Sequence, residues 1–134
     1  MTDPTERPVQ PTPEPGPAVP AGSGIAPNMA GALAYFLGAL SGVLFLVIDK
    51  DRSFVRFHAM QSIVLTVAWI AVWVVLSVLS AVPFVGWLVG LLLSIAIGIG
   101  GFVLWIYLMY RAYSGDEWEV PVVGPYARRF ASEV

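Results

Sequence analysis

His58 is the single histidine of the chain and the side chain best suited to proton exchange near neutral pH. Arg56 and Gln61 are its polar neighbours in the sequence. One histidine cannot hold a metal ion alone, and no cysteine or second histidine supplies a further ligand. We therefore expect His58 to bond a loop carbonyl, with a pH sensor or proton relay as the alternative.

Residues suited to catalysis form no pattern that predicts an active site. No nucleophile lies beside a base, no paired carboxylates share a helix, and no glycine-rich loop follows a strand. The acidic neighbours Asp116, Glu117 and Glu119 are typical of a solvated tail. The sequence thus predicts no enzyme, no metal site and no cofactor, and an enzyme that uses His58 is the weakest alternative.

Polar and tryptophan side chains recur at regular intervals from His58 onward. The members of this polar stripe are His58, Ser62, Thr66, Trp69, Trp73, Ser77 and Ser80. Because their intervals are three or four residues, all of them lie on one face of a helix. One interpretation is that the hydroxyls bond carbonyls one turn earlier and the tryptophans fill packing gaps. The other is a face that lines a pore or binds a partner.

Small residues recur every four positions in two other segments. They are Ala30, Ala34, Gly38 and Gly42 in the first segment, and Gly86, Gly90, Ser94 and Gly98 in the second. Small side chains one turn apart open a groove that admits a neighbouring backbone. We expect both grooves to pack against other helices, and one possible arrangement packs the two grooves against each other. The partner helices can belong to the same chain or to a second copy.

The composition requires an apolar solvent for much of the chain. Of its 134 residues, 57% are hydrophobic and 12% are charged, and the mean hydropathy is +0.77. A soluble domain carries about a quarter charged residues and could not bury this much apolar surface at so small a size. We predict an all-α integral membrane protein. With a net charge of −2 and no basic stripe, we expect no nucleic-acid partner.

Three transmembrane helices are predicted, over residues 29–48, 57–82 and 85–110, in a membrane domain of residues 28–113. The first is about 30 Å long as a helix, which matches the hydrocarbon thickness. The apolar run between Phe57 and Tyr110 is too long for one span and must form a tight hairpin at Pro83-Phe84-Val85-Gly86. Residues 38–42 raise an alternative, in which the first segment is a re-entrant hairpin.

The two ends of the chain differ in composition. Residues 1–27 are rich in proline and poor in apolar side chains, which predicts a disordered tail. Residues 114–134 follow a helix stop at Gly115 and combine aromatic side chains with Arg128 and Arg129, which predicts a segment at the membrane interface. Basic residues near the span ends predict a cytoplasmic C-terminus and, with three spans, an N-terminus outside. The re-entrant alternative puts both termini inside.

Four stretches of the chain carry a resemblance to a family. They are Ala32-Leu33-Ala34-Tyr35-Phe36-Leu37-Gly38, the loop Asp49-Lys50-Asp51 with Phe54-Val55, Arg56-Phe57-His58-Ala59-Met60-Gln61-Ser62, and the exit from Arg111-Ala112-Tyr113 to Val120-Pro121. Through them the chain resembles small prokaryotic membrane proteins that are themselves similar to the Tic-twenty component of chloroplast protein import. The resemblance implies a multi-pass protein of the prokaryotic plasma membrane, and for the plastid component a channel or import-complex subunit.

These observations favour a scaffold or subunit of a membrane complex, which acts through helix–helix association. Its expected partners are the lipid bilayer and either a second copy or another membrane protein. The alternative is a small homo-oligomeric channel or translocation component, lined by the polar stripe.

Overall fold

The computed structural model describes residues 22–134, and the regular structure in this range is entirely α-helical. The helices are α1 (Pro27–Phe36), α2 (Ala39–Ile48), α3 (Ser53–Ser80), α4 (Gly86–Tyr113) and α5 (Val123–Glu133). The all-α class predicted from the composition is confirmed. The disordered tail predicted for residues 1–27 lies mostly outside the described range.

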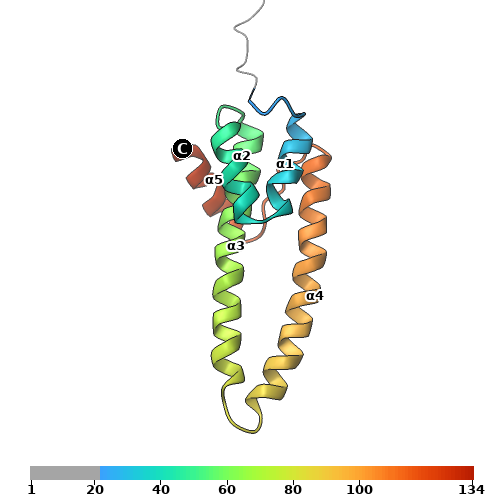
Figure 1. The fold of residues 1–134 in the computed structure, drawn as a ribbon, viewed down its shortest axis with the longest axis vertical. Helices are drawn as coiled ribbons and strands as arrows, with labels where there is room; N and C mark the ends of the chain where they lie inside the picture. The colour runs from blue at the N-terminus through green and yellow to red at the C-terminus, as the bar shows by residue number, and fades with distance from the viewer. Residues whose placement is uncertain (1–21) are drawn as a thin grey trace, which may run out of the picture.

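Helices α3 and α4 form a long antiparallel hairpin that gives the molecule its shape (Figure 1). Each has 28 residues and is therefore about 42 Å long. Their most apolar stretches have hydropathies of 2.5 and 2.4, so both are long and apolar enough to cross a bilayer, as predicted for the second and third spans. Gly86 starts α4 against the Leu79 carbonyl oxygen, which a Cβ atom would approach to 2.6 Å.

The continuous helix predicted over residues 29–48 is not what the structure shows. The segment is two helices of 10 residues each, α1 and α2, which break at Leu37 and Gly38 and turn back on themselves (Figure 1). Gly38 has φ 59° and ψ −129°, a combination that turns reserve for glycine. Length and hydropathy fitted a single span, but this backbone conformation ends the helix halfway.

The backbone groups freed at this break have partners within the protein. Gly38 N–H donates to the Tyr35 carbonyl at 3.1 Å. Ser41 Oγ accepts from the Leu37 N–H at 3.0 Å and donates to the Ala34 carbonyl at 2.9 Å. Irregular backbone is tolerated at membrane depth only where the protein supplies such partners. The break is therefore compatible with a re-entrant hairpin.

The α1–α2 hairpin lies beside one end of the α3–α4 pair, at the end that also carries α5 (Figure 1). Its core joins three helices and consists of Ala30, Ala34, Phe45, Val55 and Ala59. Beyond this end, most side chains of α3 and α4 are exposed. The protein therefore has a packed head of five helical segments and a two-helix stem.

The two grooves of small residues pack against α3 and not against each other. In the first groove, a Cβ atom on Gly42 would lie 2.9 Å from the Ala59 carbonyl oxygen, and one on Gly38 would lie 2.9 Å from Thr66 Oγ1. In the second, Gly90 leaves no room for a side chain beside Ser80. Both sets of contacts lie within the chain. Gly98 differs, because nothing lies within 4 Å of the position of its missing Cβ.

Helix α5 packs on the protein through its small residues. Ala127 and Ala131 are buried against Met60 of α3, whereas Tyr126 and Phe130 face outward. Arg128 pairs with Glu117 and Glu119 and lies over the Phe57 ring, 4.4 Å from its centroid. Alanines make the contact with α3 because they allow the closest approach of two helices. The contact of the aromatic residues with the membrane interface stays a prediction.

Gly38→Ala tests the break. We expect it to lower the free energy of unfolding by about 1–3 kcal/mol, because alanine is strained at a positive φ and would press on Thr66. Reversible unfolding in mixed detergent micelles measures the change. Gly100→Ala is the control, since nothing lies within 4 Å of its Cβ position and it should leave stability unchanged or raise it slightly. Equal stability of the two variants would contradict the assignment of the turn to Gly38.

Candidate functional site

Three side chains form a buried polar cluster where the α1–α2 hairpin meets α3. They are Tyr35, His58 and Gln61, and each is at most 1% exposed. Tyr35 Oη lies 3.0 Å from His58 Nδ1 and accepts a hydrogen bond from Gln61 Nε2 at 2.9 Å. Buried polar groups are usually bonded, and the three side chains of this cluster bond one another through the Tyr35 hydroxyl.

The segment after α4 fixes the orientation of the Gln61 amide. Gln61 Nε2 also donates to the Trp118 carbonyl at 3.1 Å, and Oε1 accepts from the Val120 N–H at 3.4 Å. A carbonyl can only accept and an N–H can only donate, so the amide has one orientation. Since Gln61 donates to Tyr35, the tyrosine hydroxyl donates to His58 Nδ1. The neutral ring of His58 then carries its proton on Nε2.

His58 is enclosed by aromatic rings. The rings of Phe54 and Phe57 meet it edge-on, with centroids 4.5 Å and 5.1 Å away. Its Nε2 faces the backbone of Asp116 after α4, outside hydrogen-bonding geometry. The sequence predicted a hydrogen bond from His58 to a loop carbonyl, but among the described residues the partner of its ring is the Tyr35 hydroxyl. At 1% exposure the ring has no open side for a substrate.

The α4 helix joins the same assembly through Trp105. Its Nε1 donates to the Tyr35 carbonyl at 2.8 Å, and Tyr35 also packs with Leu108 and Ala112. Tyr35 thus contacts α3 through its hydroxyl and α4 through its backbone. The polar cluster and Trp105 together connect the hairpin, both long helices and the segment that leads to α5.

Most hydroxyls of the polar stripe bond within their own helix. Those that donate to the carbonyl four residues earlier are Thr66, Ser77 and Ser80, and Ser94 on α4 does the same. Ser62 differs, because its Oγ donates to the Gly38 carbonyl at 2.9 Å and so holds the hairpin tip on α3. These bonds follow the first interpretation of the stripe, with Ser62 as the exception.

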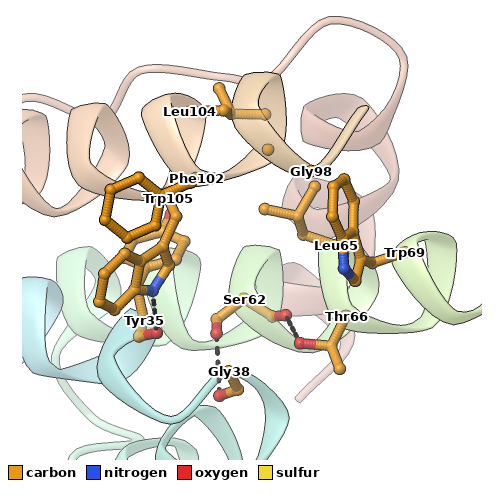
Figure 2. A pocket seen from close by; sticks show the side chains of 11 residues that line it. Tyr35, Gly38, Ser62, Leu65, Thr66, Trp69, Gly98, Phe102, Leu104 and Trp105 are labelled. Carbon is orange, nitrogen blue, oxygen red and sulfur yellow. Dashed lines mark hydrogen bonds between the residues drawn. The ribbon is translucent and has the colours of Figure 1, made fainter. Parts of the chain in front are cut away.

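Trp69 of the stripe borders a pocket of about 330 Å³ below the hairpin tip, between α3 and α4 (Figure 2). Trp69 lies directly on Gly101 of α4, where no Cβ would fit, and Trp73 meets Trp69 edge-on. The pocket is lined by Tyr35, Gly38, Ser62, Leu65, Thr66, Trp69, Gly98, Gly101, Phe102, Leu104 and Trp105.

A second buried polar group holds the segment before α1. Asp49 is 1% exposed and accepts from the Ser23 N–H at 2.8 Å and from Ser23 Oγ at 2.7 Å. Arg52 pairs with Asp49 and donates to the Ile25 carbonyl at 2.6 Å. Residues 22–26, at the end of the predicted tail, are thus bonded to the loop between α2 and α3.

The pKa of Asp49 reflects two opposing effects. Burial raises it, but hydrogen bonds from Ser23 and Arg52 outweigh burial and lower the pKa of the carboxyl below its ordinary value of 3.8. The folded state therefore favours the charged form of Asp49.

Sequence reasoning missed Tyr35, Ser41, Asp49, Gly101 and Trp105 as residues that build this region. Tyr35 carried a usable signal, because a tyrosine within an apolar helix needs a partner for its hydroxyl. Asp49 lies in a charged loop, where nothing in the sequence distinguishes it from Asp51. The contact of Gly101 with Trp69 depends on the register of α3 and α4, which no local pattern reports.

Sequence comparisons identify relatives of this chain. The magnetosome magnetite crystal formation protein family (MamF/MmsF) matches residues 24–127. A UPF0132 membrane protein of Methanocaldococcus jannaschii is 38% identical over 108 residues, which cover 81% of this chain and 91% of the relative. Another, from Archaeoglobus fulgidus, is 41% identical over 102 residues, covering 76% and 92%. No solved structure matches the chain.

These relatives correct the resemblance drawn from the sequence. The family that matches is MamF/MmsF, and the similar proteins are archaeal UPF0132 membrane proteins. The link to the Tic-twenty component, and with it the implied import role, is therefore wrong. The Arg56–Ser62 run that suggested the link lies in the range that the MamF/MmsF family matches, and it contributes His58 and Gln61 to the polar cluster.

Gln61→Leu tests the polar cluster. We expect faster amide hydrogen exchange in residues 116–122, because the Trp118 carbonyl and the Val120 N–H lose their partner. The free energy of unfolding should fall by about 1–3 kcal/mol. Ser77→Ala is the matched control, since the Ser77 hydroxyl is exposed and bonds only its own helix. Unchanged protection of residues 116–122 in Gln61→Leu would count against the cluster as the link to this segment.

Asp49 predicts an acid-sensitive contribution to stability. Its pKa is lower in the folded state, so ionised Asp49 stabilises the fold fully above the unfolded pKa. This contribution is lost as pH falls through the folded pKa, which lies below 3.8. Unfolding in detergent, followed from neutral to acidic pH, measures the loss. Asp49→Asn should be less stable at neutral pH and should lack this acid transition; an identical pH profile would refute the assignment.

Proposed function

The chain belongs to the MamF/MmsF family of magnetosome magnetite crystal formation proteins, and we propose from this premise that it is a non-enzymatic membrane protein that acts by helix–helix association. The setting is the plasma membrane of a prokaryotic cell. The partner is a second copy of the chain or another membrane protein.

The observation that carries this proposal is a pair of apolar faces on the stem. Exposed aliphatic side chains recur at intervals of three, four or seven residues on each long helix. They are Val67, Ile70, Val74 and Val78 on α3, and Leu92, Ile99, Val103 and Ile106 on α4. None of these faces meets another helix of the described chain, so lipid or a partner helix must cover them.

The bonding of the polar groups supports association over the two alternatives. The hydroxyls of the stem bond their own backbone, so no observation favours a pore lined by the polar stripe. His58 is enclosed by rings and bonded to Tyr35, which argues against its use as a catalytic base. These features fit a head that is held rigid and a stem that is free to pack.

Two complete spans and a re-entrant α1–α2 hairpin replace the three spans in this proposal. The hairpin begins and ends at the end of the stem that carries the basic loop of residues 49–56. Arg111, Arg128 and Arg129 belong to the same end, whereas residues 81–85 at the other end carry no charge. The excess of basic residues on the cytoplasmic side then puts both termini in the cytoplasm, in place of an N-terminus outside.

Magnetite crystal formation is a property stated for the family. In the part of the chain that the structure describes, no group of three or more His, Asp or Glu side chains could hold a metal ion. The proposal therefore rests on the helix faces and not on metal chemistry.

Single cysteines test the topology, because the chain has none of its own. Ala26→Cys and Ser132→Cys should both resist a membrane-impermeant maleimide in intact cells and react in inverted vesicles. Phe84→Cys, in the turn between α3 and α4, should behave in the opposite way. Reaction of Ala26→Cys from outside the cell would instead support three complete spans.

Cysteine scanning of the stem tests helix association. Single cysteines are placed at Val67, Val74, Ile99 and Val103, and native membranes are treated with a permeable bis-maleimide. We expect crosslinked dimers only from the positions on one helix face, so that the crosslinking yields differ between these positions. Buried positions are the controls: Leu76→Cys and Leu108→Cys, at 5% and 1% exposure, should give none. Absence of adducts at every exposed position would overturn the proposal.

A further inference from the structure

The pocket below the hairpin tip is a gap that the fold itself holds open. Above it, Ser62 Oγ donates to the Gly38 carbonyl at 2.9 Å, so the tip stands against α3. Trp105 Nε1 donates to the Tyr35 carbonyl at 2.8 Å, so the same turn also stands against α4. The hairpin is therefore wedged between the two long helices and keeps them apart.

Below the pocket the two helices meet again. Ser80 lies on Gly90 there, whereas Trp69 lies on Gly101 within the pocket wall, with no space for a Cβ at either glycine. Between the Trp69–Gly101 and Ser80–Gly90 contacts, Gly98 has nothing within 4 Å of its Cβ position and lines the pocket (Figure 2). The helices cannot close the gap without breaking one of the two sets of contacts.

The position of the pocket defines what surrounds its mouth. Ser62 and Trp69 follow Arg56 by about 9 Å and 20 Å along the helix axis. With the basic loop at the membrane surface, these depths lie within the roughly 30 Å thickness of the hydrocarbon. The pocket therefore opens to acyl chains and not to water.

The chemistry of the walls fits an apolar occupant. The hydroxyls of Ser62 and Thr66 donate to carbonyls, the Tyr35 hydroxyl belongs to the polar cluster, and Trp105 Nε1 is bonded. Leu65, Phe102 and Leu104 provide the remaining apolar surface. Among the described residues, Trp69 Nε1 is the one polar side-chain atom of these walls without a hydrogen bond, so an occupant needs to supply at most one acceptor. An empty pocket would forfeit the dispersion contacts of the apolar side chains.

The bounds of the pocket favour a lipid chain over a helix. The hairpin tip closes the gap on the head side, and Trp69 crosses it to Gly101. A helix about 10 Å across would have to displace these contacts, whereas a flexible chain of methylene groups can enter beside them.

We propose that this pocket is a lipid-binding site that takes one acyl chain of a membrane phospholipid, inserted from the side between α3 and α4. The chain fills the gap beneath the hairpin and completes the packing of Trp69 and Trp105. This site depends on the placement of α3 and α4 in the bilayer and not on the identity of any partner protein.

Gly98→Leu tests the site, with Gly100→Leu as its matched control. Both glycines lie in α4 with open space at the Cβ position, but only Gly98 lines the pocket. Each protein is reconstituted in vesicles of phosphatidylcholine and phosphatidylglycerol that contain phosphatidylcholine with a diazirine on its acyl chain. It is then exchanged into mild detergent, irradiated and digested, and the labelled residues are mapped by mass spectrometry.

We expect label retained on Leu65, Phe102 and Leu104 in the natural protein and in Gly100→Leu. In Gly98→Leu it should fall roughly tenfold, the change expected when about two buried methylene groups are displaced. Gly98→Ala is a milder change, and the label that it retains should lie between these two amounts. It keeps the test informative if Gly98→Leu does not fold.

Three results would overturn the proposal. The first is equal labelling of the pocket residues in Gly98→Leu and Gly100→Leu. The second is retained label spread evenly over the exposed stem, for example on Val67 and Leu92. The third is a dimer in native mass spectrometry that carries no lipid and that Gly98→Leu dissociates, which would mean that a side chain of a second copy fills the pocket.

Discussion

A helix that breaks within the hydrocarbon must find hydrogen-bond partners for the backbone groups it frees, and this constraint shapes the whole protein. At the break around Gly38, the partners come from the hairpin itself through Ser41, from α3 through Ser62 and from α4 through Trp105. In the re-entrant position that we propose for the hairpin, water could not serve. The hairpin can therefore exist only where it contacts both long helices at once, which sets its position in the fold and opens the pocket beneath its tip.

The polar cluster extends the same logic toward the C-terminus. Gln61 bonds Tyr35 on one side and the Trp118 and Val120 backbone on the other, so the segment that leads to α5 is tied to the hairpin through α3. Helix α5 then packs against α3 through Ala127 and Ala131 and covers this side of the head. Polar groups and close packing are concentrated in the head, whereas the stem keeps an apolar surface for lipid or a partner.

The sequence predicted the two long helices well because length and hydropathy are local properties, and Gly115, with φ 85°, follows α4 as expected for a helix stop. It did not predict the hairpin as the first choice, because residues 29–48 have the length and apolarity of a span while their fate depends on one glycine conformation. The regular spacing of the polar stripe could be recognised in the sequence, but the distinct role of Ser62 depends on where Gly38 lies in space. Tyr35 and Gln61 come together across 26 residues, which no short pattern encodes. The link to Tic-twenty failed because the Arg56–Ser62 run on which it rested lies in the range that the MamF/MmsF family matches.

The re-entrant hairpin is the central claim, and one distance tests it most directly. Nitroxide labels on Ala26→Cys and Phe84→Cys report the separation between the start of α1 and the turn of the stem by electron–electron double resonance. With a re-entrant hairpin, these residues lie at opposite ends of the stem, and we predict a distance of about 40 Å from the length of α3. A complete first span would bring them to the same membrane surface, and a distance below about 20 Å would contradict the account, since a span covers the roughly 30 Å of hydrocarbon.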